Sequence, residues 1–175
     1  MRHNAGFTLI ETMISVSVLG ILAGVAAPSF LELIEHQHAS AAMSSLTTHM
    51  AQARMAAITY RRPAVLCPST TGTSCDAGSD WSGGWMLFLD QDGNHQFDVT
   101  DEILRADLTP TSRHLRLPGT AGRPQLRYLP DGRSAGSNLT ISVCNTKGDL
   151  LGKVIVNNGG RPRTETPKAA TPCPA

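Results

Sequence analysis

The sequence of 175 residues lacks the short motifs by which common catalytic sites are recognised. It contains no G-x-S-x-G nucleophile elbow, no H-E-x-x-H zinc motif and no G-x-x-x-x-G-K-[ST] phosphate loop. The six histidines are scattered along the chain, and three of them fall on one predicted helix. We therefore predict that the protein is not an enzyme.

Aromatic residues are also scarce, at 5% of the chain, whereas glycine and proline are common, with 16 and 11 residues. This composition favours short strands and many turns over a helical bundle. Once about 30 N-terminal residues are set aside as a membrane segment, the remainder is long enough for one globular domain.

Basic residues are missing from one stretch of the chain. From Asp76 to Glu102 there are seven acidic residues and no Lys or Arg. From Ile103 onward there are eleven basic residues against four acidic ones, although the formal net charge of the whole chain is only +1. The near-zero net charge of the chain therefore results from an acidic segment and a basic C-terminal half that cancel each other.

Charge of either sign is missing near the N-terminus, where the 20 residues from Thr12 to Leu31 carry none. As a helix, this run is long enough to cross the hydrocarbon core of a bilayer, which is about 30 Å thick. A secretory signal peptide has a shorter apolar region with its cleavage site behind it. Here the small residue, Gly6, precedes the run, so cleavage after Gly6 leaves the helix on the mature protein with Phe7 as its first residue.

The string Gly6-Phe7-Thr8-Leu9-Ile10-Glu11 behind a short basic leader resembles the class III leader of type IV pilins and type II secretion pseudopilins. The resemblance implies that a prepilin peptidase cleaves between Gly6 and Phe7 and methylates the new amine of Phe7. In a filament of such subunits, Glu11 can pair with that amine, which offsets the cost of burying both charges. The simpler alternative is a plain membrane anchor with Glu11 at its interface.

The four cysteines include no C-x-x-C pair, which argues against a zinc site. An exported domain meets an oxidising compartment, where disulfides form. Of the three possible connectivities we favour Cys67–Cys75, which closes a short loop, and Cys144–Cys173, which holds the C-terminal tail to a strand.

We predict one long helix from Phe7 to about Tyr60, ended by Arg61-Arg62-Pro63. Gly20 and Pro28 interrupt it, and Pro28 is expected to kink or loosen the turn before it, unless both residues are simply the common Gly and Pro of membrane helices. An apolar stripe follows on the second half, and we expect it to pack on the protein's own sheet rather than on a partner helix. The stripe comprises Ala39, Met43, Leu46, Met50, Ala53, Ala57 and Tyr60. The three histidines off the stripe are expected to be solvated: His36, His38 and His49.

After the helix, short apolar runs separated by Pro, Gly, Asn and Asp predict strands. They are 64–67, 85–89, 102–108, 115–117, 125–129, 139–144, 150–156 and an edge strand at 161–165. The pattern predicts an antiparallel sandwich or an open barrel.

Several segments resemble the GspH/FimT family of minor pilins and pseudopilins, and they span most of the chain. They are the junction Arg62-Pro63-Ala64-Val65-Leu66-Cys67, Gly84-Trp85 leading into Asp90-Gln91-Asp92-Gly93-Asn94, the turn Leu129-Pro130-Asp131-Gly132-Arg133, and Gly160-Arg161-Pro162-Arg163. The resemblance implies an α+β, type IV pilin-like fold, in which a long N-terminal membrane-spanning helix packs on an antiparallel two-sheet β domain. The implied parts are a leader peptide (1–6), a transmembrane and assembly helix (7–34), its amphipathic continuation (35–62) and a periplasmic β domain (63–175).

The acidic segment has oxygen-bearing side chains at alternate positions, as calcium-binding loops of the EF-hand type do. The ligands that we would expect are Asp90, Asp92, Asn94 and Asp98. His95 stands where such a loop needs Gly, and the twelfth position is the short Asp101. The favoured alternative is an acidic turn that binds no metal and needs no cofactor.

The basic half suggests contact with phosphate groups. Arg161 and Arg163 are two residues apart, so in a strand they point to the same side. Together with Lys153 and Lys147 they form a surface that would bind double-stranded DNA without sequence preference. Some FimT-like members of the family serve DNA uptake through a Gly-Arg-x-Arg motif, which residues 160–163 match. The alternative is a solvated basic edge that prevents strand-to-strand aggregation.

We therefore predict a minor pilin anchored in the inner membrane by one helix, with its β domain in the periplasm. Its partners would be other pilins, the prepilin peptidase and, through the basic half, DNA. The alternative is a GspH-like minor pseudopilin of a type II secretion system, acting in protein secretion without DNA. The Gly-Arg-x-Arg motif and the cysteines favour the pilus.

Overall fold

The computed structural model describes residues 8–108 and 112–174, and for residues 25–29 only the backbone. It divides into two compact units, one ending at His36 and one comprising Gln37–Ala175. Helix α1, Leu9–Tyr60, is assigned as helix throughout, including Gly20 and Pro28, where the sequence suggested an interruption. In the part of the chain that the structure describes, no helix combines the length and the apolar character needed to cross a membrane.

Both ends of α1 have a local cause. At the start, the Thr8 hydroxyl accepts a hydrogen bond from the backbone N–H of Glu11 (3.3 Å), as an N-cap does. At the end, Arg61 adopts a left-handed φ of 54° and Pro63 follows, a combination that stops helices. The predicted end of the helix at Tyr60 is confirmed.

The second half of α1 buries most of the predicted stripe. Its buried members are Ala39, Met43, Leu46, Met50, Ala53 and Ala57. Tyr60 is exposed instead, because it is the last helical residue and lies beyond the last side chain that the helix buries. His36 and His38 are exposed as predicted, but the prediction for His49 is wrong. His49 is buried, because a strand covers the flank of the stripe as well as its centre.

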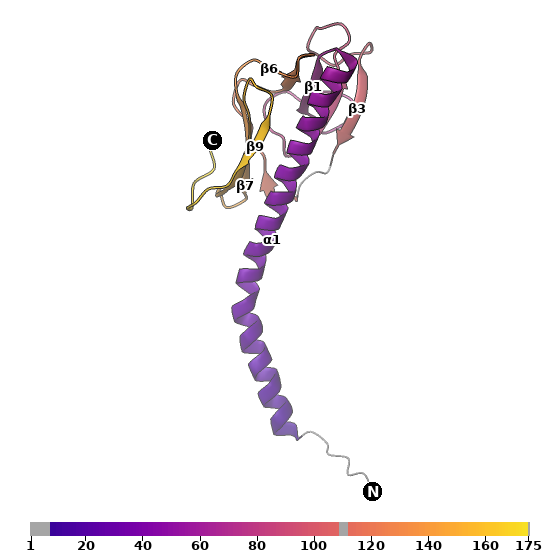
Figure 1. Cartoon of the computed structure of the whole chain (residues 1–175). Helices are drawn as coiled ribbons and strands as arrows, with labels where there is room; N and C mark the ends of the chain where they lie inside the picture. The colour runs from indigo at the N-terminus through magenta and orange to yellow at the C-terminus, as the bar shows by residue number, and fades with distance from the viewer. Residues whose placement is uncertain (1–7, 109–111, 175) are drawn as a thin grey trace. The chain divides into compact units, whose positions relative to one another are not determined.

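The strands form two antiparallel sheets, as predicted. The five-stranded sheet has the order β3 (Glu102–Asp107), β2 (Trp85–Leu89), β1 (Ala64–Pro68), β5 (Leu126–Tyr128) and β6 (Ser134–Ala135). The four-stranded sheet has the order β4 (Leu115–Arg116), β7 (Leu139–Asn145), β8 (Leu150–Val156) and β9 (Pro162–Glu165). Strand β6, with only two residues, was not predicted. Figure 1 shows the second half of α1 crossing the β domain, with β7 and β9 on one side of it and β3 on the other.

One core holds the helix and both sheets together. It joins the buried stripe of α1 to inward-facing side chains of β1, β2, β5, β7 and β8, among them Leu66, Trp85 and Tyr128. The other face of β1 and β2 is also buried, under Cys75 and Phe97 from the loops that cross it. Burial on both faces explains why these two strands are continuous apolar runs in the sequence.

Candidate functional site

Strand β9 is the outer strand of the four-stranded sheet, and it carries one of the two predicted DNA-binding arginines. Its register with β8 places Arg163 beside Ile155 and Glu165 beside Lys153. Because alternate strand residues point to the same side, Arg163, Glu165 and Lys153 share one face of the sheet. Arg161 immediately precedes the strand, and both arginines are exposed. The structure therefore brings three of the four predicted basic residues to this edge.

The two arginines differ in what surrounds them. Arg163 Nε lies 3.0 Å from Oε1 of Glu165, which neutralises part of its charge. Arg161 makes no ion pair within the described residues. An exposed ion pair contributes little to stability, but a phosphate must compete with Glu165 for Arg163. Arg161 is therefore the more available cation of the two.

Lys147, the fourth predicted residue, lies far from Arg161. It is exposed in the turn between β7 and β8, whereas Arg161 follows the turn at the other end of β8. The six residue steps from Leu150 to Val156 separate the two turns by roughly 20 Å. Lys147 can therefore join a DNA contact only where the ligand is long enough to follow the sheet.

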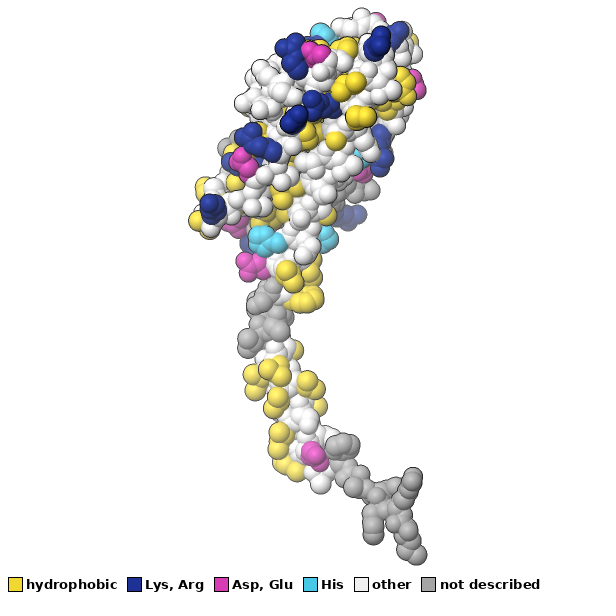
Figure 2. Space-filling model, viewed as in Figure 1, with side chains coloured by type: hydrophobic (Ala, Val, Ile, Leu, Met, Phe, Trp, Pro, Cys, Tyr) yellow, Lys and Arg dark blue, Asp and Glu magenta, His cyan; other side chains and the backbone are white. Residues whose placement is uncertain are grey.

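A second turn lies against the one that precedes Arg161. A Cβ atom on Gly160, whose φ is +73°, would collide with the carbonyl oxygen of Gly132, so the two turns touch through backbone. Arg133 follows Gly132 and pairs with Asp131, with 2.7 Å between Nε and Oδ2. Hydrogen bonds from the Arg133 amide and side chain lower the pKa of Asp131. Figure 2 shows Lys and Arg side chains spread over the β domain, several with an acidic side chain beside them.

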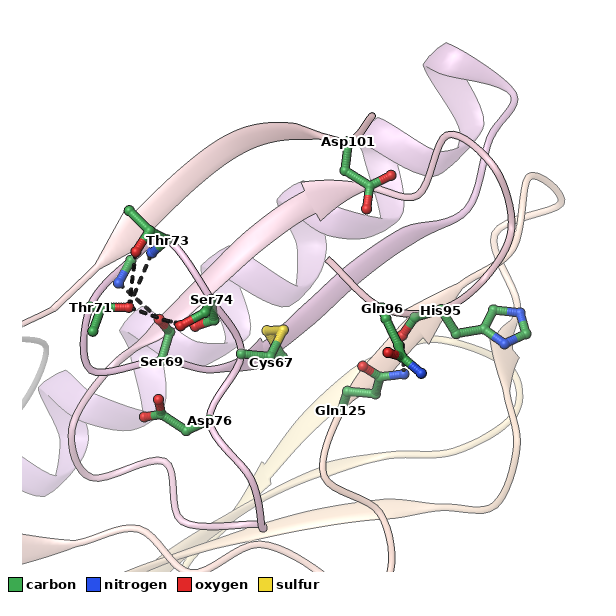
Figure 3. The surroundings of a disulfide bond; sticks show 12 residues. Cys67, Ser69, Thr71, Thr73, Ser74, Asp76, His95, Gln96, Asp101 and Gln125 are labelled. Atoms are coloured by element: carbon green, nitrogen blue, oxygen red, sulfur yellow. Dashed lines mark hydrogen bonds between the residues drawn. A yellow bond between two sulfur atoms is a disulfide. The ribbon is translucent and has the colours of Figure 1, made fainter. Parts of the chain in front are cut away.

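Both predicted disulfides are present. Cys144 of β7 is bonded to Cys173, and the backbone N–H of Leu150 donates to the carbonyl of Thr171 (2.8 Å), so the tail is held to the sheet at two points. Cys67 of β1 is bonded to Cys75 and closes the short loop. In Figure 3 the Ser and Thr side chains of that loop point toward one another beside Cys67. The Ser69 hydroxyl, for example, donates to the carbonyl of Ser74 (2.6 Å).

The acidic loop brings together a different set of carboxylates from the one predicted. Asp90, Asp92 and Asp101 each place one oxygen within 4.8 Å of the other two. Asp98 is not in this group. Its oxygens accept hydrogen bonds from the Thr100 hydroxyl (2.6 Å), the Thr100 backbone N–H (2.8 Å) and Asn94 Nδ2 (2.7 Å). Those bonds lower the pKa of Asp98. The predicted ligand set of Asp90, Asp92, Asn94 and Asp98 therefore stays a prediction, and the structure adds Asp101 as the third carboxylate beside Asp90 and Asp92.

The loop carboxylates also accept backbone N–H groups, as in a turn without metal. Asp90 accepts from Gly93 (2.8 Å) and His95 (3.2 Å), and Asp101 accepts from Gln91 (2.8 Å). This geometry accounts for the acidic residues by itself, so a cation is not needed to explain the loop.

The predicted assembly residue, Glu11, lies at the start of α1. Gly6 and Phe7 are outside the described residues. Glu11 is in the first helical turn, with its side chain exposed. The spacing Thr8-x-x-Glu11 is also that of a capping box, so Glu11 has a local role available besides pairing with another subunit.

Sequence reasoning missed a third arginine, Arg123. The tripeptide Gly122-Arg123-Pro124 repeats Gly160-Arg161-Pro162, and this repetition is the signal that was available. The two copies have opposite surroundings: Arg161 is exposed, whereas Arg123 is only 7% exposed.

Two family models match the sequence. "Type II transport protein GspH" matches residues 42–160, and "Prokaryotic N-terminal methylation motif" matches residues 1–27. Among characterised proteins, the chain is 29% identical over 170 residues to the pilin-like protein PilA1 of Thermus thermophilus, covering 91% of this chain and 97% of that protein. It is 33% identical over 101 residues to a fimbrial protein of Pseudomonas aeruginosa, covering 58% of this chain and 62% of that protein.

Solved structures share the fold. The type IV minor pilin FimU of Pseudomonas aeruginosa superposes with a TM-score of 0.58 at 18% identity, covering 81% of this chain and 96% of that one. The minor pseudopilin EpsH from the type 2 secretion system of Vibrio cholerae superposes with a TM-score of 0.53 at 14% identity, covering 75% and 99%. At these identities the likeness shows the arrangement of helix and sheets alone.

Proposed function

We propose that this chain is a minor subunit of a type IV pilus and that it binds DNA through the edge at β9. The chain belongs to the GspH family of type II transport proteins. The role of a structural subunit, as a minor pilin or pseudopilin, follows from the family. The choice of the pilus and the DNA contact are our proposal.

The N-terminal methylation motif supports processing at the position that the sequence predicts. A prepilin peptidase would cut between Gly6 and Phe7 and methylate the amine of Phe7. The uncharged run from Thr12 to Leu31 would hold the subunit in the inner membrane before assembly, with the β domain in the periplasm. In the filament, Glu11 would pair with the Phe7 amine of a subunit, where both charges are buried among apolar helices.

The exposed Arg161 beside an edge strand is the observation that carries the DNA proposal. Guanidinium groups bind phosphate oxygens by paired hydrogen bonds, and an edge strand leaves them accessible. Arg163 and Lys153 add positive charge on one face of the same edge, with Glu165 as the opposing group. Arg133 comes from the turn that touches Gly160.

The test is DNA binding by the fragment 35–175, which keeps the entire second unit, including the core and both disulfides. A labelled duplex is titrated at several salt concentrations and followed by fluorescence anisotropy. We expect the affinity to fall as the salt concentration rises, so that the slope of log K against log salt is negative. In the Arg161→Ala/Arg163→Ala variant the slope should be shallower by about 1.8, which corresponds to the loss of two phosphate contacts.

Two further variants sharpen the result. Glu165→Gln should tighten binding, because it releases Arg163 from its ion pair. Arg116→Ala is the matched control, since Arg116 is an exposed arginine on β4, the opposite edge of the same sheet. Absence of binding at low salt, or an equal loss with Arg116→Ala, would refute the assignment of DNA binding to this edge.

The alternative is a minor pseudopilin that acts in protein secretion without DNA. The family description and the fold shared with EpsH favour it. In that case the basic residues form a solvated edge, and the exposed charges of β9 serve to keep it from pairing with other strands.

A further inference from the structure

Arg123 carries a buried charge that lacks a counter-charge. It is 7% exposed, in the loop before β5. Its Nη2 donates to the hydroxyl of Ser134 (2.8 Å) and the carbonyl of Ala135 (2.7 Å), while its Nη1 is buried with no hydrogen-bond partner. In the described part of the chain, no carboxylate lies within ion-pair distance of it. A buried cation in this state is costly unless an anion pairs with it.

The neighbouring tyrosine cannot supply that anion. The Tyr128 hydroxyl is buried and unpartnered, and it lies close enough for Arg123 to influence its ionisation. Burial raises the pKa of Tyr128 to about 12, so the phenol is neutral at physiological pH. Within the described residues, no negatively charged group therefore pairs with Arg123, and an anion from outside the chain could do so.

A cavity of about 290 Å³ opens beside Arg123 and offers a place for it. Its wall includes a second cation, half-buried Arg127, and no carboxylate. Gly136 lies against the guanidinium, since a Cβ atom built there would be 3.8 Å from Cζ of Arg123, in van der Waals contact with it. Polar groups of Gln125 and Ser137 complete the wall.

The acidic loop closes one side of this cavity. His95 lines it with a left-handed φ of 68°, an uncommon conformation for a residue with a side chain. Its backbone is fixed on both sides: the N–H donates to Asp90 Oδ2 (3.2 Å), and the carbonyl accepts from Gln125 Nε2 (3.0 Å). Figure 3 shows Gln125 beside His95 and Gln96, with the imidazole of His95 pointing away from Gln125. This wall is therefore built by specific contacts.

We propose that this cavity binds a small ligand through a carboxylate or phosphate group, which pairs with Arg123 and Arg127. The guanidinium fork suits the oxygens of either group. The cavity volume lies at the lower end of the range of small-molecule sites, so the ligand is small. The wall of the cavity shares no residue with the β9 edge, and the proposal stands whether or not that edge binds DNA.

The test uses the full chain in non-ionic detergent, labelled with ¹⁵N and titrated at constant ionic strength. One arm adds inorganic phosphate and the other adds acetate. We expect saturable shifts of the amide signals of Gly122, Gly136 and Ser137 in at least one arm, and the arm that saturates identifies the chemical group.

Variants separate the cavity from general surface charge. Arg127→Gln should weaken binding at least fivefold, and Ala135→Leu, which fills the cavity without changing charge, should do the same. Arg116→Gln is the matched control and should leave the binding unchanged, because Arg116 is exposed on β4 and does not line the cavity. Shifts that rise linearly in both arms, or equal affinities for the wild type and Arg127→Gln, would overturn the proposal and leave water as the partner of Arg123.

Discussion

The indole Nε1 of Trp85 donates a hydrogen bond to Nδ1 of His49 across 2.8 Å, joining β2 to helix α1 inside the core. Because Nδ1 accepts this bond, the neutral imidazole carries its proton on Nε2. Burial lowers the pKa of His49, Arg105 adds to the lowering, and Asp107, whose Oδ2 lies 3.9 Å from Nδ1, opposes it. The contact between the helix and this sheet therefore requires a neutral histidine.

This contact predicts a loss of stability in mild acid. Below the ordinary pKa of 6.5, the histidine of the unfolded chain binds a proton that the folded chain resists, so unfolding becomes more favourable as pH falls toward the lowered folded-state pKa. Thermal unfolding of the wild type and of His49→Gln, measured from about pH 7.5 to about pH 5.5, should show the steeper decline in the wild type. His38→Gln removes an exposed histidine and should behave like the wild type. Parallel curves for the wild type and His49→Gln would contradict the assignment.

The two disulfides should contribute unequally to stability. Their sequence separations are 29 residues for Cys144–Cys173 and 8 for Cys67–Cys75. A longer closed loop restricts the unfolded chain more, so we expect the paired Cys→Ser replacements to cost about 3–4 kcal/mol at Cys144–Cys173 and about 2–3 kcal/mol at Cys67–Cys75. Urea unfolding of the fragment 35–175 measures both, and the reverse order would mean that native-state contacts outweigh chain entropy.

Calcium gives a direct test of the acidic loop. If a cation binds, Asp90, Asp92 and Asp101 are the carboxylates placed to hold it, and millimolar calcium should raise the melting temperature. Asp92→Ala and Asp101→Asn should remove this calcium-induced rise. Asp98→Asn should lower the melting temperature in the absence of calcium, but calcium should still raise it. An unchanged melting temperature of the wild type in calcium would mean that the loop is an acidic turn without metal.

Glu11 should matter for assembly and not for insertion. Glu11→Ala removes the carboxylate proposed to pair with the Phe7 amine, so the subunit should reach the membrane and be absent from sheared filaments. Glu32→Ala is the matched control, because Glu32 closes the other end of the uncharged run. Normal amounts of Glu11→Ala in filaments would leave Glu11 as a helix-capping residue alone.

Most of the helix and strand positions could be predicted from the sequence, because each depends on a pattern of neighbouring residues. The apolar run Trp85–Leu89 and the Arg61-Arg62-Pro63 stop each determine an element without help from distant residues. Strand β6 was missed, since Ser134–Ala135 has no pattern of its own and pairs only because β5 lies beside it.

The candidate site was harder, because its chemistry depends on which segments meet. His49 was expected in solvent, and only the placement of Trp85 over it reverses that. The identical tripeptides around Arg123 and Arg161 differ only in what the fold places around them. Asp98 and Asp101 are the same residue type in the same loop, and only the course of the loop places Asp101, and not Asp98, beside Asp90 and Asp92.

The central claim, a pilus subunit whose β9 edge binds DNA for uptake, is tested most directly in the host. A strain in which the chain is replaced by Arg161→Ala/Arg163→Ala is compared with the wild type and with the deletion, and DNA uptake and protein secretion are measured in the same cultures. We predict that uptake falls by roughly tenfold or more in the variant while secretion and the amount of subunit in filaments stay at wild-type levels. Wild-type uptake in the variant, together with lost secretion in the deletion, would contradict the account and assign the chain to a secretion pseudopilus.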